Sequence, residues 1–196
     1  MKTLTKILSV LSLVTVLGIN VTDAVAQDNK TEKNVKKTDK AVSDIIGANM
    51  YETNLLQLAT QKAKSQELKD MAAKLLPMHQ QMGTEIKTFA SSNGYTVEAE
   101  EAKKYNGKIK KWESHNTGLE LDYDLAEELV DLHKDGIDLL QNAKEDTKDE
   151  ALKAWIDKQI PMMKDHLAML QPMKDKMKKP WTEKNRPNPD MREGKQ

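Results

Sequence analysis

Four side chains that could ligate a metal ion recur at helix spacing within apolar stripes. Asn49 and Glu52 interrupt a stripe of steps of three and four residues that runs from Val42 to Ala63, and Glu52 is the candidate ligand of the two. A comparable stripe elsewhere in the chain holds each of the histidines His79, His133 and His166. Burying such groups is costly unless they are paired, hydrogen-bonded or metal-bound. Because imidazole and carboxylate from facing helices are the usual ligands in bundle cores, these four residues are the candidate metal ligands.

Methionines lie beside these histidines and form a second set of candidates. The chain has 11 methionines, and the secondary ligand candidates among them are Met78, Met82, Met162 and Met163. Thioether and imidazole together favour Cu(I), whereas copper, zinc and iron all stay open for the imidazole and carboxylate set. The alternative interpretation is that the methionines are flexible core filler.

Two other interpretations of the inward-facing residues stay open. One is a hydrogen-bonded polar layer that fixes the register between helices, and the other is a coincidence of stripe assignment. Counted from the predicted turns, Glu52, His79 and His133 are each about 13 or 14 residues away and lie at similar heights. His166 is about 20 residues from its turn, a mismatch on the order of 10 Å at 1.5 Å per residue. We therefore expect His166 to occupy a second layer, unless a loop shifts the register.

The elements that must position these residues are four helices. Apolar periodicity predicts them over residues 38–63, 65–92, 117–143 and 147–177. Short loops join each pair, and a longer connection, residues 95–116, holds a predicted short helix at 98–112. This arrangement predicts an all-α fold, an antiparallel four-helix bundle built from two helical hairpins.

Helix starts and stops are marked by turn chemistry. Thr117 with Glu120, and Thr147 with Glu150, have the spacing of capping boxes at the starts of the third and fourth helices. The pair Asn93-Gly94 predicts a left-handed stop after the second helix.

Composition excludes several kinds of partner and chemistry. With 31 basic and 31 acidic residues interleaved along the chain, no basic face favours nucleic acid. The chain has no cysteine, so neither a disulfide framework nor thiolate chemistry is expected. Di-iron bundles use Glu-x-x-His motifs, but the residues three before the histidines are Leu76, Val130 and Met163. We therefore assign no catalytic residue and do not expect an enzyme.

The N-terminus has the pattern of a secretion signal over residues 1–26. Lys2 and Lys6 precede an apolar run, residues 7–19, and Ala24-Val25-Ala26 follows at cleavage spacing. The run is too short for a membrane-spanning helix, which needs ~20 residues, and no later segment is apolar enough. We expect export to a Gram-negative periplasm, a flexible segment at 27–37, a bundle domain at 38–177 and a disordered tail at 178–196.

Residues 43–173 resemble the bacterial domain-of-unknown-function family 4142, whose members are often labelled outer membrane proteins. The matching stretches are NMYETNLLQLATQKA with Glu52, ELKDMAAKLLPMH, VDLH preceded by Asp122, and ALKAWIDKQIPMMKDHLAML. The resemblance implies an exported bundle of the ferritin-like superfamily and no established activity. Members commonly carry an acidic pair before the histidine of the second helix, where this chain has Pro77-Met78, so the surroundings of His79 are softer.

Two functional hypotheses follow. The first is a non-catalytic exported module of the envelope, with a binding or stress-related role and a protein partner, and with an association with the outer membrane left open. The second is a metal-binding or metal-handling protein that uses the inward-facing His, Glu and Met side chains.

Overall fold

A computed structural model describes residues 21–97, 99–114 and 118–184 of the chain. These residues are helical apart from turns, and the helices are α1 (Val21–Lys62), α2 (Gln66–Ser92), α3 (Ala99–Ser114), α4 (Leu119–Asp146) and α5 (Glu150–Lys184). The chain divides into two compact units at residue 33, and the bundle described below belongs to the unit that begins at Asn34.

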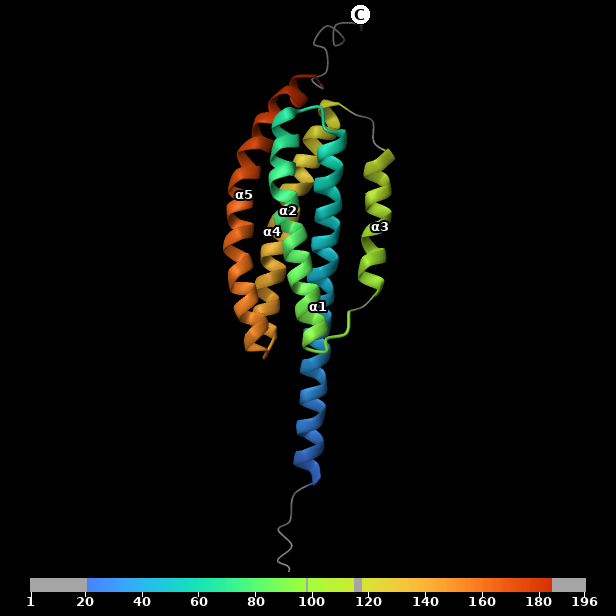
Figure 1. The fold of residues 1–196 in the computed structure, drawn as a ribbon, viewed down its shortest axis with the longest axis vertical. Coiled ribbons are helices and arrows are strands. Elements are labelled where there is room, and N and C mark those ends of the chain that lie inside the picture. The colour runs from blue at the N-terminus through green and yellow to red at the C-terminus, as the bar shows by residue number, and fades with distance from the viewer. Residues whose placement is uncertain (1–20, 98, 115–117, 185–196) are drawn as a thin grey trace, which may run out of the picture. The chain divides into compact units, whose positions relative to one another are not determined.

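The four long helices form two antiparallel hairpins, α1 with α2 and α4 with α5, which confirms the predicted all-α bundle (Figure 1). The short helix α3 lies beside α1 in the same view. Trp112 ties α3 to the bundle, because its indole N–H donates to the Tyr51 hydroxyl at 2.9 Å, and that hydroxyl lies 2.9 Å from a carboxylate oxygen of Glu128. No helix in the described part of the chain has the length and apolar character needed to cross a membrane.

Two helices are longer than predicted. α1 begins at Val21 and α5 ends at Lys184, whereas the sequence predicted a start near residue 38 and an end near residue 177. The flexible segment predicted at residues 27–37 rested on their polar composition. Because these residues contain neither glycine nor proline, that composition is also compatible with a helix. The first 20 residues and residues 185–196 lie outside the described part, and the predicted signal peptide and domain limits stay predictions.

The turn of the first hairpin is held from the opposite hairpin by Asp122. Its carboxylate oxygens accept from the backbone N–H groups of Lys64 (2.8 Å) and Ser65 (2.7 Å), while the Ser65 hydroxyl accepts from the N–H of Leu68 as the helix N-cap. Asp122 is 1% exposed. A single buried carboxylate therefore satisfies backbone donors just before α2.

Asp122→Ala is expected to lower the free energy of unfolding by about 2–3 kcal/mol, because two partly buried backbone donors lose a charged acceptor. Urea unfolding of the purified protein measures this change. Asp131→Ala is the matched control, since Asp131 is exposed and its ion pair is with Lys134 on its own helix; a loss below about 0.5 kcal/mol is expected there. Equal losses in the two variants would contradict a capping role for Asp122.

The start of α5 corrects the predicted capping box at Thr147. The N-cap is Asp149, whose carboxylate accepts from the N–H groups of Ala151 (2.8 Å) and Leu152 (3.0 Å). Thr147 belongs to the turn, where its hydroxyl accepts from the N–H of Asp149 and lies 3.2 Å from the hydroxyl of Thr38 on α1. A threonine and an aspartate two residues apart can both cap, and the sequence prediction chose the wrong one.

Glycine marks two other helix ends. The N-cap of α4 is Gly118, with φ of +150° and no side-chain cap. Thr117 of the predicted capping box lies outside the described residues. The predicted stop after α2 is confirmed, because Gly94 has φ of +71° and the N–H of Tyr95 donates back to the carbonyl of Ala90 at 2.9 Å.

The buried apolar residues form two separate clusters, each with contributions from all four long helices. The first core cluster comprises Leu55, Leu56, Leu58, Ala59, Ala63, Leu68, Ala72, Leu75, Leu121, Leu125, Ala126, Leu129, Val130, Leu170 and Met173. The second core cluster comprises Val42, Ile45, Ile46, Met82, Ile86, Ala90, Ile137, Leu140, Ala143, Leu152, Ile156 and Met163. On each of the four long helices, a buried polar side chain lies between the residues that belong to one cluster and those that belong to the other.

Candidate metal centre

A single polar layer, defined by Glu52, His79, His133 and His166, lies between the two core clusters. Each of the four long helices supplies one of these residues at the point where its contribution to one cluster ends and to the other begins. Their exposed fractions are 4%, 0%, 0% and 1%. The inward direction that periodicity predicted for all four side chains is confirmed, and the layer is closed above and below by apolar side chains.

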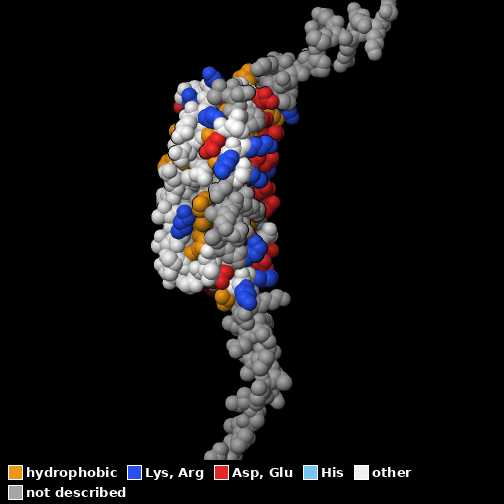
Figure 2. All heavy atoms as spheres, turned by 90° about the vertical axis from the view of Figure 1, so that its right-hand side faces the viewer, with side chains coloured by type: hydrophobic (Ala, Val, Ile, Leu, Met, Phe, Trp, Pro, Cys, Tyr) orange, Lys and Arg blue, Asp and Glu red, His pale blue; other side chains and the backbone are white. Residues whose placement is uncertain are grey.

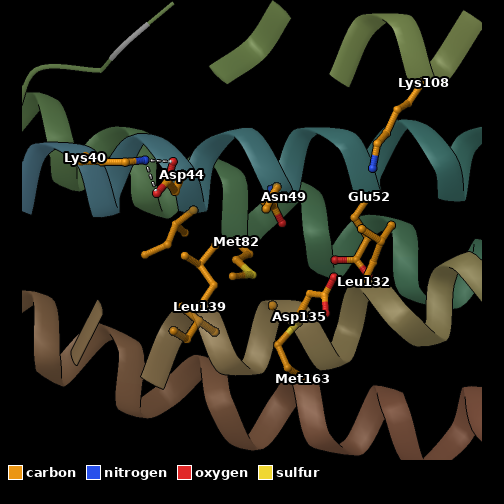
Figure 3. Close-up of a pocket in the computed structure, with 14 residues that line it drawn as sticks. Lys40, Asp44, Asn49, Glu52, Met82, Lys108, Leu132, Asp135, Leu139 and Met163 are labelled. Atoms are coloured by element: carbon orange, nitrogen blue, oxygen red, sulfur yellow. Dashed lines mark hydrogen bonds and ion pairs between the residues drawn. The ribbon is translucent and has the colours of Figure 1, made fainter. Parts of the chain in front are cut away.

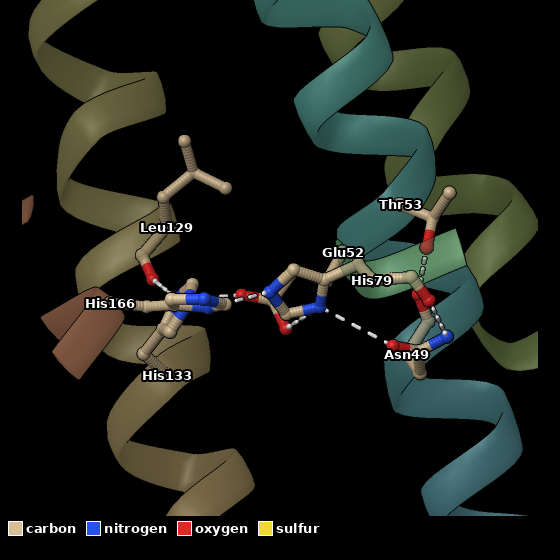
Figure 4. A network of polar contacts seen from close by, with 7 residues as sticks. All are labelled: Asn49, Glu52, Thr53, His79, Leu129, His133 and His166. Carbon is tan, nitrogen blue, oxygen red and sulfur yellow. Dashed lines mark hydrogen bonds and ion pairs between the residues drawn. The ribbon is translucent and has the colours of Figure 1, made fainter. Parts of the chain in front are cut away.

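The three histidines converge on one another (Figure 4). Their ring centroids are 5.2 Å apart for His79 and His133, 5.2 Å for His79 and His166, and 5.4 Å for His133 and His166. One ring nitrogen from each residue can be chosen so that all three atoms lie within 4.8 Å of one another. Imidazole nitrogens at this separation can bind one transition-metal ion after small side-chain adjustments.

Glu52 contacts the Nδ1 sides of two of the histidines. Its Oε1 lies 2.6 Å from Nδ1 of His133, and its Oε2 lies 3.4 Å from Nδ1 of His79. The backbone carbonyl of Leu129, 2.8 Å from Nδ1 of His133, is a second acceptor for that nitrogen. A carboxylate and a carbonyl at Nδ1 place the proton there, which leaves Nε2 of His133 and His79 as the ligand atoms.

Several of these nitrogen atoms have little or no protein partner. Nε2 of His133 and Nε2 of His166 make no hydrogen bond with any described residue. Nε2 of His79 lies 3.2 Å from Nδ1 of His166, so one of those two atoms must be the acceptor. Oε1 of Glu52 also makes no hydrogen bond with a described residue, although it lies 2.6 Å from Nδ1 of His133. A buried polar atom without a hydrogen bond costs about 1–3 kcal/mol, and three of them in one layer require an explanation.

Asn49 is a site residue that the sequence analysis placed in the α1 stripe without a role. Its amide N–H donates to the backbone carbonyl of His79 at 2.9 Å, and its Oδ1 lies 3.3 Å from Nδ1 of the same residue. Asn49 therefore fixes both the backbone and the ring of His79. The close approach depends on Gly83, because a Cβ at that position would lie 2.6 Å from Nδ2 of Asn49.

Gly83→Ala is expected to lower the free energy of unfolding by about 1–3 kcal/mol, because the added methyl group displaces Asn49 in a packed interface. Gly107→Ala is the control: a Cβ there meets nothing within 4 Å, and this change inside α3 is expected to stabilise by up to about 1 kcal/mol. Thermal and urea unfolding measure both. If Asn49→Ser does not recover part of the loss when combined with Gly83→Ala, the clash is not the cause.

Electrostatics shifts the pKa values of the four residues of the layer in different directions. Burial raises the pKa of Glu52, but His133 and His79 outweigh this effect and the pKa lies below its usual value. Burial lowers the pKa of His133, but the Glu52 carboxylate outweighs it and the pKa is raised. For His79 burial prevails over Glu52, and for His166 burial, His79 and His133 lower the pKa to about 4. Neutral rings at His79 and His166 have lone pairs available for a metal ion.

The position of His166 corrects the prediction of a second layer. The predicted mismatch counted 20 residues from Asp146, but residues 147–149 form a turn and α5 begins at Glu150, so His166 is 16 residues into its helix. His133 is 13 residues from the end of α4, which leaves a mismatch of about 4.5 Å at 1.5 Å per residue. Side-chain length and helix tilt can absorb that difference, and His166 joins the single layer.

The four candidate methionines divide into two pairs. Met82 (5% exposed) and Met163 (2% exposed) belong to the second core cluster, directly beside the polar layer. Met78 is exposed at 36%, and Met162 packs half-buried against the outside of that cluster. Met82 and Met163 are thus buried in the core cluster beside the layer, whereas the side chain of Met78 is exposed.

Met82 and Met163 also line a pocket of about 300 Å³ that reaches Glu52 (Figure 3). Charged side chains line the same pocket, among them Asp44 and Asp135. None of the three histidines lines it. The pocket therefore borders the carboxylate side of the layer and not the rings.

The outer surface contrasts with this layer. On the face drawn in Figure 2, acidic and basic side chains are interspersed, with few apolar groups between them. This mixture agrees with the balanced composition of the chain.

The chain belongs to a protein family described as a domain of unknown function, DUF4142, whose pattern matches residues 23–173. This match includes all four residues of the polar layer and confirms the predicted family. It does not test the ferritin-like superfamily placement that the resemblance implied. Neither the curated proteins nor the solved structures contain a significant match to the chain.

Proposed function

We propose that this member of the DUF4142 family binds one transition-metal ion through His79, His133 and His166. The observation that carries the proposal is the convergence of three buried imidazoles with ligand atoms within 4.8 Å, two of whose Nε2 atoms have no partner among the described residues. An ion bound by the three rings would give Nε2 of His133 a partner and replace the hydrogen bond between His79 and His166.

Glu52 has an orienting role in this proposal. Its contacts are with Nδ1 of His79 and His133, the side of each ring opposite the proposed ion. Such carboxylate–histidine–metal arrangements fix the tautomer and the ring orientation of the ligands. We had expected Glu52 among the direct ligands, and the geometry supports the orienting role better.

Metal binding rather than oxidative catalysis is the activity proposed. Di-iron bundles bridge two ions with several carboxylates, whereas the buried carboxyl groups among residues of described burial are Glu52 and Asp122, and Asp122 caps the first hairpin turn. A storage, buffering or delivery role for one ion fits one carboxylate and three imidazoles.

Elemental analysis of protein purified without chelator, with thermal melts after separate additions of Cu(I), Zn(II) and Fe(II), tests the proposal. One equivalent of ion is expected. At a free ion concentration of 1,000 times the Kd, binding adds about 4 kcal/mol to the free energy of unfolding, which raises the Tm by about 10 °C. His79→Ala should abolish both effects, while Gln80→Ala, an exposed neighbour, should change neither. With no ion bound and no shift for any of the three metals, the layer would be a structural device that fixes helix register.

We also propose that the protein is exported to the periplasm before it acts. The proposal rests on the N-terminal sequence alone: two lysines, the apolar run 7–19 and Ala24-Val25-Ala26. N-terminal sequencing of protein from a fractionated Gram-negative host is expected to give Gln27 as the first residue, in the periplasmic fraction. An uncleaved chain in the cytoplasm would contradict export.

A further inference from the structure

We infer that the histidine layer selects a soft monovalent ion, Cu(I), and holds it three-coordinate between His79, His133 and His166. This inference rests on the proposed metal site and adds the identity and charge of its ion. Three observations carry it: the apolar core residues that flank the three rings, the charge of the layer, and the methionines beside it.

The first observation concerns coordination number. Zn(II) held by three protein ligands keeps a water or substrate in its fourth position. A buried water needs two to four polar partners. The core clusters that flank the three rings are apolar, and the polar groups of Glu52 and Asn49 lie at the Nδ1 sides of the rings, away from the proposed ion. The nearby pocket is lined by Glu52 and by none of the histidines. Trigonal coordination by three nitrogens, which Cu(I) accepts, needs no fourth ligand.

The second observation concerns charge. Metal ligation uses neutral imidazoles, so the one formal charge that the layer itself contributes is the Glu52 carboxylate, 4% exposed. A monovalent ion brings the layer to zero net charge. A divalent ion leaves one uncompensated positive charge between two apolar clusters, and an unpaired charge is expensive to bury. Charge therefore favours Cu(I) over Zn(II) and Fe(II).

The third observation concerns softness. Met82 and Met163 are the buried residues of the second core cluster on α2 and α5 nearest in sequence to His79 and His166. Met163 reaches this position because α4 has Gly136 there: a Cβ would lie 2.9 Å from the Met163 methyl carbon. Thioether sulfur favours Cu(I) and offers little to a harder divalent ion. The flanking side chains thus favour the same ion as the charge.

Equilibrium competition measures the preference. The full mature protein is titrated anaerobically with Cu(I) against a chromophoric Cu(I) chelator and, separately, with Zn(II) against a zinc chelator. The Kd for Cu(I) is expected to be at least 100-fold lower than that for Zn(II). X-ray absorption of the Cu(I) form is expected to give three imidazole nitrogens and no fourth ligand. Tighter Zn(II) binding or a four-coordinate copper would overturn the inference.

Met163→Glu provides a sharper test, because it places a carboxylate three residues before His166 on α5. If charge and softness set the preference, the ratio of Zn(II) to Cu(I) affinity should rise at least 10-fold relative to Met163→Gln, an uncharged side chain of similar length. Equal ratios in the two variants would overturn the charge argument. Far-ultraviolet dichroism and melting of both variants establish that they fold, and the wild-type coordination number decides the inference if either does not.

The outcomes separate this inference from the function on which it rests. If Cu(I), Zn(II) and Fe(II) all fail to bind, the metal site itself is wrong. If Zn(II) or Fe(II) binds in a manner that needs His79 but Cu(I) binds no more tightly, the metal site stands and only the monovalent selectivity is wrong.

Discussion

Glu52→Ala is expected to lower the free energy of unfolding of the metal-free protein by about 3–5 kcal/mol. The carboxylate lies 2.6 Å from Nδ1 of His133 and 3.4 Å from Nδ1 of His79, and the contacting side chains are almost completely buried. Removal of one partner of a buried ion pair leaves the other without compensation, and the truncation also opens a cavity. Glu67→Ala is the control, because Glu67 forms an exposed ion pair with Lys176; a loss below about 1 kcal/mol is expected there.

Glu52→Gln separates the charge of this residue from its shape. The amide oxygen can still accept from one ring, so the loss in stability should be smaller than for Glu52→Ala. Because Glu52 contacts the far side of the ligand rings, its replacement should weaken metal binding by about 10- to 100-fold, as other orienting partners do. Urea unfolding and metal competition measure the two effects. A complete loss of binding in Glu52→Gln would mean that the carboxylate itself ligates the ion.

Periodicity was sufficient to predict which residues share the layer, because a period of 3.6 fixes the face of a helix on which a side chain lies. Glu52 and the three histidines were found in this way without any knowledge of contacts. Their relative heights were harder to predict, since height depends on the residue at which each helix begins. For α5 both Thr147 and Asp149 can cap, and the wrong choice contributed to the misplacement of His166.

Contacts between helices were beyond sequence reasoning for a different reason. From the sequence, Gly83 is expected only to lower the stability of its helix. The neighbouring residues of α2 do not indicate that Asn49 of α1 packs against it. Asn49 itself was visible as a polar interruption of the α1 stripe, which is the one signal that could have assigned it to the layer. The pocket beside Glu52 is likewise a product of packing, since residues from α1, α2, α3, α4 and α5 line it.

Acidification is expected to destabilise the metal-free protein before most carboxylates titrate. Burial lowers the pKa of His166 to about 4 and also lowers that of His79, from an ordinary value of 6.5. Below pH 6.5 the unfolded chain therefore binds protons at these positions that the folded chain does not bind, and stability falls. At pH 5 the His166 contribution alone amounts to about 2 kcal/mol at 1.4 kcal/mol per pH unit.

The contribution of His133 to stability depends on pH with the opposite sign to the contributions of His79 and His166. Its pKa is raised in the folded protein, so its stabilising contribution is complete below pH 6.5 and is lost as pH rises through the raised pKa. The pKa of Glu52 is lowered, so its contribution is present above its ordinary value of 4.5 and is lost as pH falls through the lowered pKa. Between pH 7 and pH 5 the two lowered histidines act together, and His133 adds no further stabilisation below pH 6.5, so a net loss is expected.

Urea unfolding at intervals between pH 7 and pH 5 measures this loss, and His166→Gln identifies its source. The variant removes one of the two responsible protonation sites, so its stability should fall less steeply with decreasing pH than that of the wild type. A wild-type stability that stays constant over this range would mean that the rings take up protons while folded. The layer would then admit water, which could serve as a fourth ligand to a bound ion. The loss of stability at low pH and the three-coordinate ion both depend on the same apolar closure by the two core clusters.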